Sequence, residues 1–526
     1  MPVPWPPSAS SLTVGSSAVQ LRWNEHTSLD RFVNRVNHRP QEDVMESIPL
    51  LDRAGRCRSP ALVGRSLAAS LVAALLVVCC GPVTARAAAL RVTLRSTISG
   101  PAGLTGPCSA RAGANNPLVV ADPRNPRRLV ATYLLGSNGA GVGAVAAVSR
   151  DAGRNWRRVA LHGMTKCEGG RADIVSDPYL AYGGGEHVYI DESGIGLGSN
   201  SSADNVFLAA SADGGASFRR AIEPFSGRPS QRAPLSPAPA HHGFVTVQYE
   251  SFDPSSALGL TPWTLGLAGS PDGGVRFAAP TAFETTPRGT VAVTVGLLRS
   301  RAALVAMSAD ISLAESGAYE RGVPTSTLTE HVMARRSYDG GARFGPPSRV
   351  GNLVMRLNDP GGCCLISSAQ APDGTLYATW TALSGVRGGE VLLYRSRDGG
   401  VTWRRLRVAR TTTRAFESSV AVAPGGRVGV LWLQGAPGAG GAAGATDVVA
   451  HLASSPDRGR TWARLRLAGP FRPGEGVNLN EGGSLGEYQG IAGLPGGFGV
   501  ALTTTGRARA SRGATVVRYL RVASQR

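Results

Sequence analysis

The sequence predicts an all-β fold that is built from repeated units of about 60 residues. Three observations support this: one octapeptide pattern occurs six times, short strand-like segments surround each copy, and similar turns recur between neighbouring segments. Self-similarity at a fixed period is the signature of a repeat architecture. Repetition of this kind can fill a 526-residue chain as one domain, although length alone suggests several.

The repeated octapeptide reads Ser-x-Asp-x-Gly-x-x-aromatic. Its copies, which begin at residues 149, 211, 270, 337, 396 and 455, are SRDAGRNW, SADGGASF, SPDGGVRF, SYDGGARF, SRDGGVTW and SPDRGRTW. Successive copies start 62, 59, 67, 59 and 59 residues apart. Six matches at four fixed positions with nearly constant spacing identify a true repeat.

Each conserved position of the octapeptide has a physical role in a tight β-turn. The aspartate can accept hydrogen bonds from backbone amides of its own turn, the glycine permits a positive φ, and the closing Trp or Phe supplies a large apolar side chain. We therefore expect a structural and not a catalytic role for six carboxylates: Asp151, Asp213, Asp272, Asp339, Asp398 and Asp457.

On these residues the chain resembles the Asp-box, or BNR-repeat, proteins of the sialidase superfamily, from about Asn115 to the C-terminus. The resemblance implies a β-propeller in which each box is the turn between the third and fourth strands of a blade. It also implies that the boxes lie on the rim away from the active site. Four strands in about 60 residues fit the general propeller pattern of four to eight blades.

Strand-like segments can be assigned around each box. In the first unit they are residues 117–120, 129–134, 142–148 and 156–161; in the fifth they are residues 365–369, 375–381, 391–394 and 403–409. Turns rich in Pro and Gly join the first two strands at residues 371–374, 423–426 and 494–497. The last of these turns lies after the final box.

That turn predicts a seventh unit, in which residues 489–492, 498–503 and 515–522 form the first three strands. Residues 90–98 are strand-like but precede the first unit and have no obvious partner. If they supply the missing fourth strand, the two ends of the repeat region close the ring. The sequence thus favours seven blades, with six as the alternative, because catalytic sialidases that the chain resembles have six.

The first 87 residues are predicted to be a leader and residues 88–526 a single propeller domain. Residues 67–80 form an apolar run of 14 residues, preceded by arginines and followed by Ala85-Arg86-Ala87, which is the pattern of a cleaved export signal. Met45 is then a candidate start. We expect a secreted or cell-envelope protein of bacterial origin without a membrane span in the mature chain. The alternative is an uncleaved N-terminal anchor.

The net charge of +19 would suit an anionic partner. However, Lys166 is the only lysine, and the arginines are scattered through a chain that is also rich in Ala and Gly. Nucleic-acid binding needs a basic stripe or cluster, so we do not expect it. The exported part keeps Cys108, Cys167, Cys363 and Cys364, which can form disulfides in a pairing left open. No cofactor or metal is expected.

Function in a propeller is expected around the central channel. The resemblance implies three arginines that hold a sugar carboxylate, a tyrosine nucleophile with a glutamate, and an aspartic acid. The candidates are Arg171, Arg232, Arg288 and Arg414 for the arginines, Tyr488 with Glu417 or Glu487 for the nucleophile, and Asp177 or Asp359 for the acid. Alternatively, Tyr488 is a packed or ligand-stacking aromatic and Asp177 only begins a strand.

One position departs from the pattern of catalytic sialidases. These enzymes have an Arg-x-Pro motif before the first strand, whereas this chain has Asn115-Asn116-Pro117. Three functions therefore remain open: an exported sialidase-like glycosidase, a noncatalytic propeller that binds a glycan or another cell-surface ligand, and an assembly factor. We expect a monomer.

Overall fold

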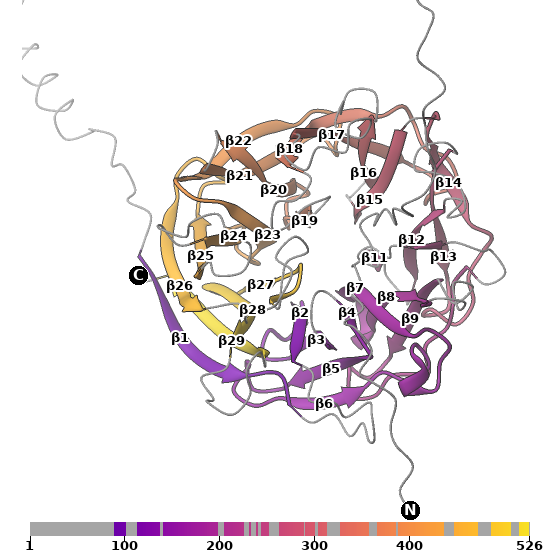
Figure 1. Cartoon of the computed structure of the whole chain (residues 1–526), viewed down its shortest axis with the longest axis horizontal. Helices are drawn as coiled ribbons and strands as arrows, with labels where there is room; N and C mark the ends of the chain where they lie inside the picture. Colours follow the sequence, from indigo (N-terminus) through magenta and orange to yellow (C-terminus); the bar gives the residue numbers. More distant parts are fainter. Residues whose placement is uncertain are drawn as a thin grey trace, which may run out of the picture. The chain divides into compact units, whose positions relative to one another are not determined.

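In the computed structural model, residues 89–524 are described except for residues 101–112, 137–139, 198–204, 226–230, 233–237, 240–243, 252–261, 289, 300–302, 313–326, 357–365, 385–387, 436–446, 472–484 and 506–514. The described strands form seven antiparallel sheets arranged in a ring, which confirms an all-β propeller with seven blades (Figure 1). Two short 3-10 helices, Lys166–Glu168 and Gly184–Glu186, interrupt the second blade.

The first three blades follow one another along the chain, except that the short strand β4 of blade 2 lies between two strands of blade 1. Blade 1 contains β2 (Ala114–Ala121), β3 (Leu129–Leu135), β5 (Gly143–Ser149) and β6 (Arg157–Ala160). Blade 2 contains β4 (Ala140–Gly141), β7 (Ile174–Tyr182), β8 (Val188–Ile195) and β9 (Asn205–Ser211). Blade 3 contains β10 (Gln231–Arg232), β11 (Ala238–Pro239), β12 (Val245–Ser251), β13 (Thr264–Ser270) and β14 (Thr281–Thr285).

The remaining blades are more regular. Blade 4 contains β15 (Thr290–Arg299), β16 (Leu304–Ser312), β17 (Thr327–Ser337) and β18 (Ser348–Arg356). Blade 5 contains β19 (Ser367–Gln370), β20 (Leu376–Ser384), β21 (Gly388–Ser396) and β22 (Arg404–Thr411). Blade 6 contains β23 (Ala415–Val422), β24 (Val428–Gly435), β25 (Val448–Ser455) and β26 (Ala463–Phe471). Blade 7 contains β27 (Gly490–Leu494), β28 (Gly497–Thr505), β29 (Thr515–Ser524) and β1 (Leu90–Thr97).

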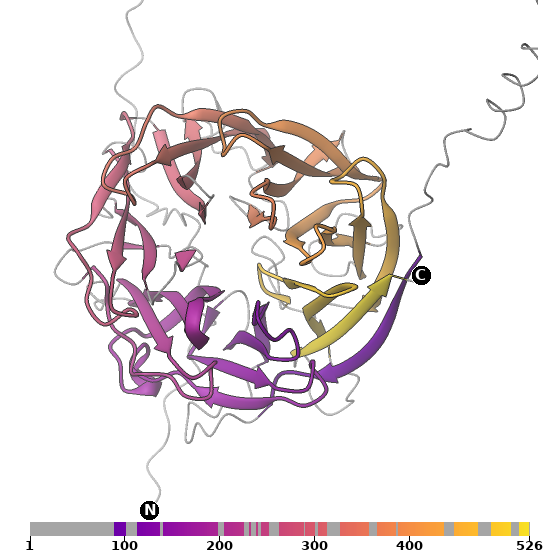
Figure 2. The same cartoon turned by 180° about the vertical axis from the view of Figure 1, so that it is seen from behind.

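Blade 7 closes the ring by joining the two ends of the repeat region. Strand β1 pairs antiparallel with β29, from Leu90 opposite Ser524 to Thr97 opposite Arg518. In both views the indigo strand β1 lies along the outer edge of the yellow strands (Figure 2). The strand that had no obvious partner in the sequence is therefore the fourth strand of the last blade, and the six-blade alternative is wrong.

A bulge at Thr93 changes which side of β1 faces each neighbouring blade. The pairing register with β29 shifts between Val92 and Leu94. Before the shift, Leu90 and Val92 pack in the core shared with blade 6. After it, Leu94 and Ile98 pack in the core shared with blade 1. The apolar residues at every second position of β1 are thus divided between two cores, because the extra residue of a bulge moves the side chains that follow it to the opposite face of the strand.

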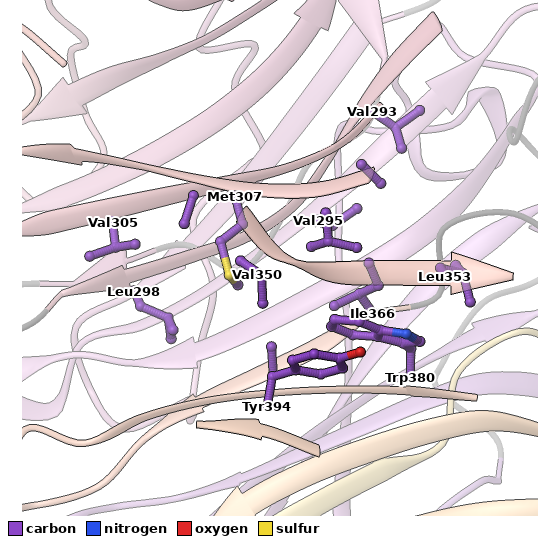
Figure 3. Packing of buried hydrophobic residues seen from close by; sticks show 14 of the residues in the cluster. Val293, Val295, Leu298, Val305, Met307, Val350, Leu353, Ile366, Trp380 and Tyr394 are labelled. Carbon is purple, nitrogen blue, oxygen red and sulfur yellow. The ribbon is translucent and has the colours of Figure 1, made fainter. Parts of the chain in front are cut away.

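Most blades are buried on both faces, so alternate residues of one strand enter different cores. On β20, Leu376 and Trp380 belong to the core between blades 4 and 5, whereas Tyr377 belongs to the core between blades 5 and 6. The ring of Trp380 stacks on that of Tyr394 with a centroid distance of 4.1 Å (Figure 3). Burial on two sides explains why the strands are nearly continuous apolar runs.

The octapeptide turns of blades 1 to 6 follow strands β5, β9, β13, β17, β21 and β25. In the first, Asp151 Oδ1 accepts hydrogen bonds from the backbone N–H groups of Arg154 and Asn155, each at 3.0 Å. Ser149 Oγ donates to Asp151 Oδ1 (2.8 Å) and accepts from the N–H of Gly153 (2.9 Å). The same serine-to-aspartate bond, 2.7–2.9 Å long, occurs in the other five turns.

The glycine of each octapeptide turn also lies against the preceding blade. Gly153 has φ +87°, and a Cβ there would overlap the ring of Tyr519 in blade 7. At Gly459, a Cβ would lie 2.7 Å from Leu406 Cδ1 in blade 5. The turn therefore needs glycine for two reasons, the left-handed backbone and the close approach of the neighbouring blade.

Candidate functional site

A central cavity of about 170 Å³ lies where the inner strands of six blades converge. Its lining comes from β2, β7, β15, β19, β23 and the segment that leads into β27. The polar side chains among the lining residues are those of Tyr179, Ser367, Ser368, Glu417, Ser418, Ser419, Glu487, Tyr488 and Gln489. The volume is below the roughly 300–1,000 Å³ of pockets that enclose drug-sized ligands, so the cavity suits one end of a larger molecule.

Three of the inner strands carry the same bulge. The register shifts occur between Asn115 and Leu118 in β2, between Ser176 and Tyr179 in β7, and between Phe416 and Ser419 in β23. In each bulge one residue that is not glycine adopts a left-handed backbone: Asn116 (φ 50°), Asp177 (φ 51°) and Glu417 (φ 50°). Such strain is costly and concentrates at functional sites.

The three bulge residues share one partner, the segment Glu487-Tyr488-Gln489. Asn116 Oδ1 accepts the backbone N–H of Glu487 at 2.6 Å. Asp177 Oδ1 accepts the hydroxyl of Tyr488 at 3.0 Å, and Glu417 Oε2 accepts the amide of Gln489 at 2.9 Å. Blades 1, 2 and 6 thus fix this segment of blade 7 in the cavity wall.

Tyr488 forms a chain of hydroxyl groups with its neighbours. The hydroxyl of Tyr179 donates to the hydroxyl oxygen of Tyr488 at 3.3 Å, and the two rings meet edge to face. Asp177 Oδ2 accepts a second bond from Ser176 Oγ at 2.8 Å. Both tyrosines are partly exposed, whereas Asp177 is buried. Burial, followed by the charge of Asp177, raises the pKa of Tyr488 well above its ordinary value.

The surroundings of Glu417 favour the protonated form of its carboxyl group. Burial raises the pKa of its carboxyl group to about 8, and the bond from Gln489 only partly offsets this. Its Oε1 has no hydrogen-bond partner among the described residues. Gln489 is held in turn, because its Oε1 accepts the N–H of Thr503 at 2.8 Å. The cavity therefore contains one carboxyl group whose neutral form is favoured, that of Glu417, and is bordered by another, that of Asp177, which accepts two hydroxyl donors.

The described structure does not bring the candidate arginines together in the cavity. Arg171 forms a two-point ion pair with Glu223, at 2.7 and 2.6 Å. Arg288 is exposed in the turn between β14 and β15, and Arg414 is half-buried just before β23. Arg232 lies in β10, opposite Glu250. No arginine is among the described lining residues.

The other sequence candidates divide into three groups. Tyr488, Glu417 and Glu487 line the cavity, and Asp177 contacts it through Tyr488. The hydroxyl of Tyr488 was expected to pair with Glu417 or Glu487, but its hydrogen-bond acceptor is Asp177. Asp359, proposed as an alternative acid, lies outside the described residues, as do Cys108, Cys363 and Cys364. Cys167 is disulfide-bonded.

Blade 2 buries three further acids. Burial raises the pKa of Glu168 to about 8 and the pKa values of Asp191 and Glu192 well above the usual range. The carboxyl oxygens of Asp191 and Glu192 have no hydrogen-bond partner among the described residues. No group of three His, Cys, Asp or Glu side chains in the described part of the chain is arranged to hold a metal ion.

Sequence reasoning missed Tyr179 and Gln489. The signal available for Tyr179 was a pair formed by a polar residue and a proline that recurs in the inner strands, as Asn116-Pro117 in β2 and as Asp177-Pro178 in β7. Tyr179 follows the second pair, where the bulge turns it towards the cavity. No pattern in the sequence distinguished Gln489, because its role depends on Glu417, which is 72 residues away in the chain.

Comparisons with known proteins found no matching family model and no matching curated protein. Among solved structures, a Hadza microbial sialidase matches at 14% identity, over 75% of this chain and 76% of its own, with a TM-score of 0.43. A polysaccharide lyase, an ulvan lyase, matches at 11% identity, over 78% and 94%, with a TM-score of 0.47. An α-L-arabinanase of Penicillium chrysogenum matches at 12% identity, over 82% and 98%, with a TM-score of 0.38.

None of these similarities assigns an activity to this chain. Within the described residues, no helix is long and apolar enough to cross a membrane.

Proposed function

We propose that the protein is an exported, Asp-box propeller of the sialidase-like kind that binds a glycan at its central cavity. The observation that carries the proposal is the cavity wall formed by Tyr179 and Tyr488, with carboxyl and amide groups beside them. Aromatic rings with a few fixed polar groups are the usual lining of a specific ligand site. Three strained bulges hold these groups in place, as expected where strain supports binding.

The ligand proposed for this cavity is a sugar without a carboxylate, not sialic acid. A carboxylate is recognised best by the planar fork of arginine. The described lining has no arginine, and Arg171, the first candidate for that role, is already bound to Glu223. Hydroxyl and carboxyl groups such as those of Ser367, Ser368 and Glu417 suit the hydroxyl groups of a neutral sugar.

A second candidate function is hydrolysis of that glycan in the same cavity. It is favoured by the contact between Tyr488 and Asp177 together with protonated Glu417. Glycosidases need one carboxylic acid to protonate the leaving group and a second group on the other side of the bond. In this proposal Tyr488 attacks the anomeric carbon, Asp177 accepts the tyrosine proton, and Glu417 protonates the oxygen of the leaving sugar. Water then cleaves the glycosyl–tyrosine bond: Glu417 takes a proton from the water, and Asp177 returns its proton to the tyrosine oxygen.

The test is binding and turnover measured on the same purified protein from residue 88 onward. A panel of fluorogenic glycosides that includes sialosides would be assayed, and binding of the free sugars would be followed by calorimetry. We expect the protein to bind neutral sugars, and we expect Tyr488→Phe and Asp177→Asn to weaken this binding. Binding of sialic acid alone would contradict the choice of ligand. Turnover that Tyr488→Phe leaves unchanged would eliminate the hydrolytic mechanism but not the binding site.

A further inference from the structure

A second hollow, here called the outer groove, lies between the outer parts of blades 6 and 7. Its volume is about 540 Å³, which is larger than the central cavity and within the range of ligand sites. Strands β1, β26, β28 and β29 supply its walls. Its polar side chains include Arg95, Thr97, Thr504, Thr505 and Arg518.

The outer groove is positively charged. Arg95 and Arg518 are exposed on β1 and β29, and strands β1, β26 and β29 contain no Asp or Glu. Neither guanidinium forms an ion pair among the described residues. Arg518 Nη1 donates only to the hydroxyl of Thr97, at 2.5 Å. Some other arginines of the ring do form ion pairs; Arg405, for example, pairs with Glu390 at 2.7 Å.

The bulge at Thr93 is what places Arg95 in the outer groove. After the register shift, Arg95 lies opposite Leu520 and Thr97 opposite Arg518, so these residues share the face towards blade 6. With unbroken alternation from Leu90 and Val92, that face would instead have received Leu94. Bulges commonly re-aim a side chain in this way. Strand β1 therefore places the positive charge of Arg95, and not the apolar side chain of Leu94, on the face towards blade 6.

We propose that the outer groove binds the sulfate or carboxylate groups of an acidic polysaccharide. Two guanidinium groups without carboxylate partners provide charge-assisted donors for such oxyanions. The hydroxyls of Thr97, Thr504 and Thr505 can bond to sugar hydroxyls. Among the described lining residues the only aromatic one is Phe471, which is buried, so these residues offer none of the exposed stacking surfaces that single-stranded nucleic acid requires. This inference does not depend on the function proposed for the central cavity.

The test uses the whole protein and a dextran sulfate oligosaccharide as the probe, with neutral dextran of the same length as its control. The double variant Arg95→Gln/Arg518→Gln removes both cations of the groove. The matched control is Arg404→Gln/Arg410→Gln on β22, where Arg410 likewise bonds to a hydroxyl, that of Ser384. Both variants lose two positive charges from exposed side chains, and thermal melting would verify that both fold.

We expect the groove variant to bind dextran sulfate about tenfold more weakly, and the control variant to change by less than about threefold. Arg95→Lys/Arg518→Lys, which keeps the charge but loses the planar fork, should lie between wild type and the glutamine variant. Asp177→Asn, in the central cavity, should leave dextran sulfate binding unchanged, so this result separates the two proposals.

Three results would overturn the inference. Equal weakening by the groove and control variants would mean that only total charge matters. Tighter binding of an oligothymidine than of dextran sulfate would assign the groove to nucleic acid. Competition by inorganic sulfate at the same concentration of sulfate groups would show a site for free anions, with no contribution from the sugar.

Discussion

The hydroxyl of Tyr488 lies 3.0 Å from Asp177 Oδ1, although 311 residues separate them in the chain. The contact joins the last blade to the second across the intervening blade 1. It exists because Asp177 occupies a left-handed bulge position and because Asn116 holds the backbone of Glu487 next to Tyr488. The bulge at Asp177 and the hydrogen bond from Glu487 to Asn116 can each be tested without measuring ligand binding.

Tyr488→Phe should lower the free energy of unfolding by about 1–2 kcal/mol, because buried Asp177 loses a hydroxyl donor. Tyr338→Phe is the matched control, since Tyr338 is 71% exposed; it should change stability very little. Urea denaturation of the two variants measures the difference. Equal stability of both variants would show that the contact does not contribute to folding.

Asn116 can be replaced in two ways that separate its hydrogen bond from its backbone conformation. Asn116→Gly loses the bond to the N–H of Glu487 but accepts a φ of 50° without strain. Asn116→Ala loses the same bond and is strained, so we expect it to be about 1 kcal/mol less stable than the glycine variant. Denaturation midpoints of the pair provide the measurement. An alanine variant as stable as the glycine variant would argue against strain at this bulge.

The pH dependence of stability should have a maximum near pH 4–5. Folded Glu168, Glu330 and Glu417 have pKa values raised to about 8 by burial, against about 4.3 in the unfolded chain. The folded state therefore binds more protons between these values, and its stability is fully present below about pH 4.3 and falls as the pH rises towards 8.

The octapeptide turns determine how the stability of the folded state falls at low pH. Hydrogen bonds from the turn outweigh desolvation and lower the pKa of Asp151 and of Asp457 to about 2. Their contribution is present above about pH 3.9 and is lost as the pH falls towards 2. Urea midpoints measured from pH 3 to 8 test both limits. Glu417→Gln should flatten the decline above pH 5; a higher midpoint at pH 8 than at pH 5 would contradict the assignment.

Gly153→Ala should destabilise the protein more than Gly426→Ala. Both glycines have a positive φ, so both variants should lose about 1 kcal/mol from backbone strain. A Cβ at Gly426 meets nothing within 4 Å, whereas at Gly153 it would overlap Tyr519 of the adjacent blade. Thermal melting of both variants gives the difference. Equal losses would indicate that Tyr519 moves aside without cost.

The fold could be predicted from the sequence because the octapeptide is a local pattern whose chemistry is complete within eight residues. The seventh blade was also predictable, since its first turn repeats the Pro-Gly pattern after the last box. The Thr93 bulge was not, because Leu90, Val92 and Leu94 read as one continuous alternation. The shift is seen only in the pairing of β1 with β29, which places Leu94 on the opposite face from Leu90 and Val92.

The candidate site was predictable only in part. Tyr488, Glu417 and Glu487 could be placed near the channel from their position before inner strands. Their partners could not, because each depends on contacts between blades. The pairing of Tyr488 with Asp177 and the ion pair of Arg171 with Glu223 join residues 311 and 52 positions apart. The sequence did not indicate which of the scattered arginines form ion pairs with carboxylates.

The pairing of β1 with β29 also fixes the order in which the ring can be completed during synthesis. Strand β1 leaves the ribosome before the other described strands, yet its partner, residues 515–524, emerges after all of them. The outer strand of blade 7 must wait for more than four hundred residues before its hydrogen bonds can form. Contacts between residues so far apart in the chain slow folding. Blades 1 to 6 can therefore assemble in turn while the ring stays open until β29 has been synthesised.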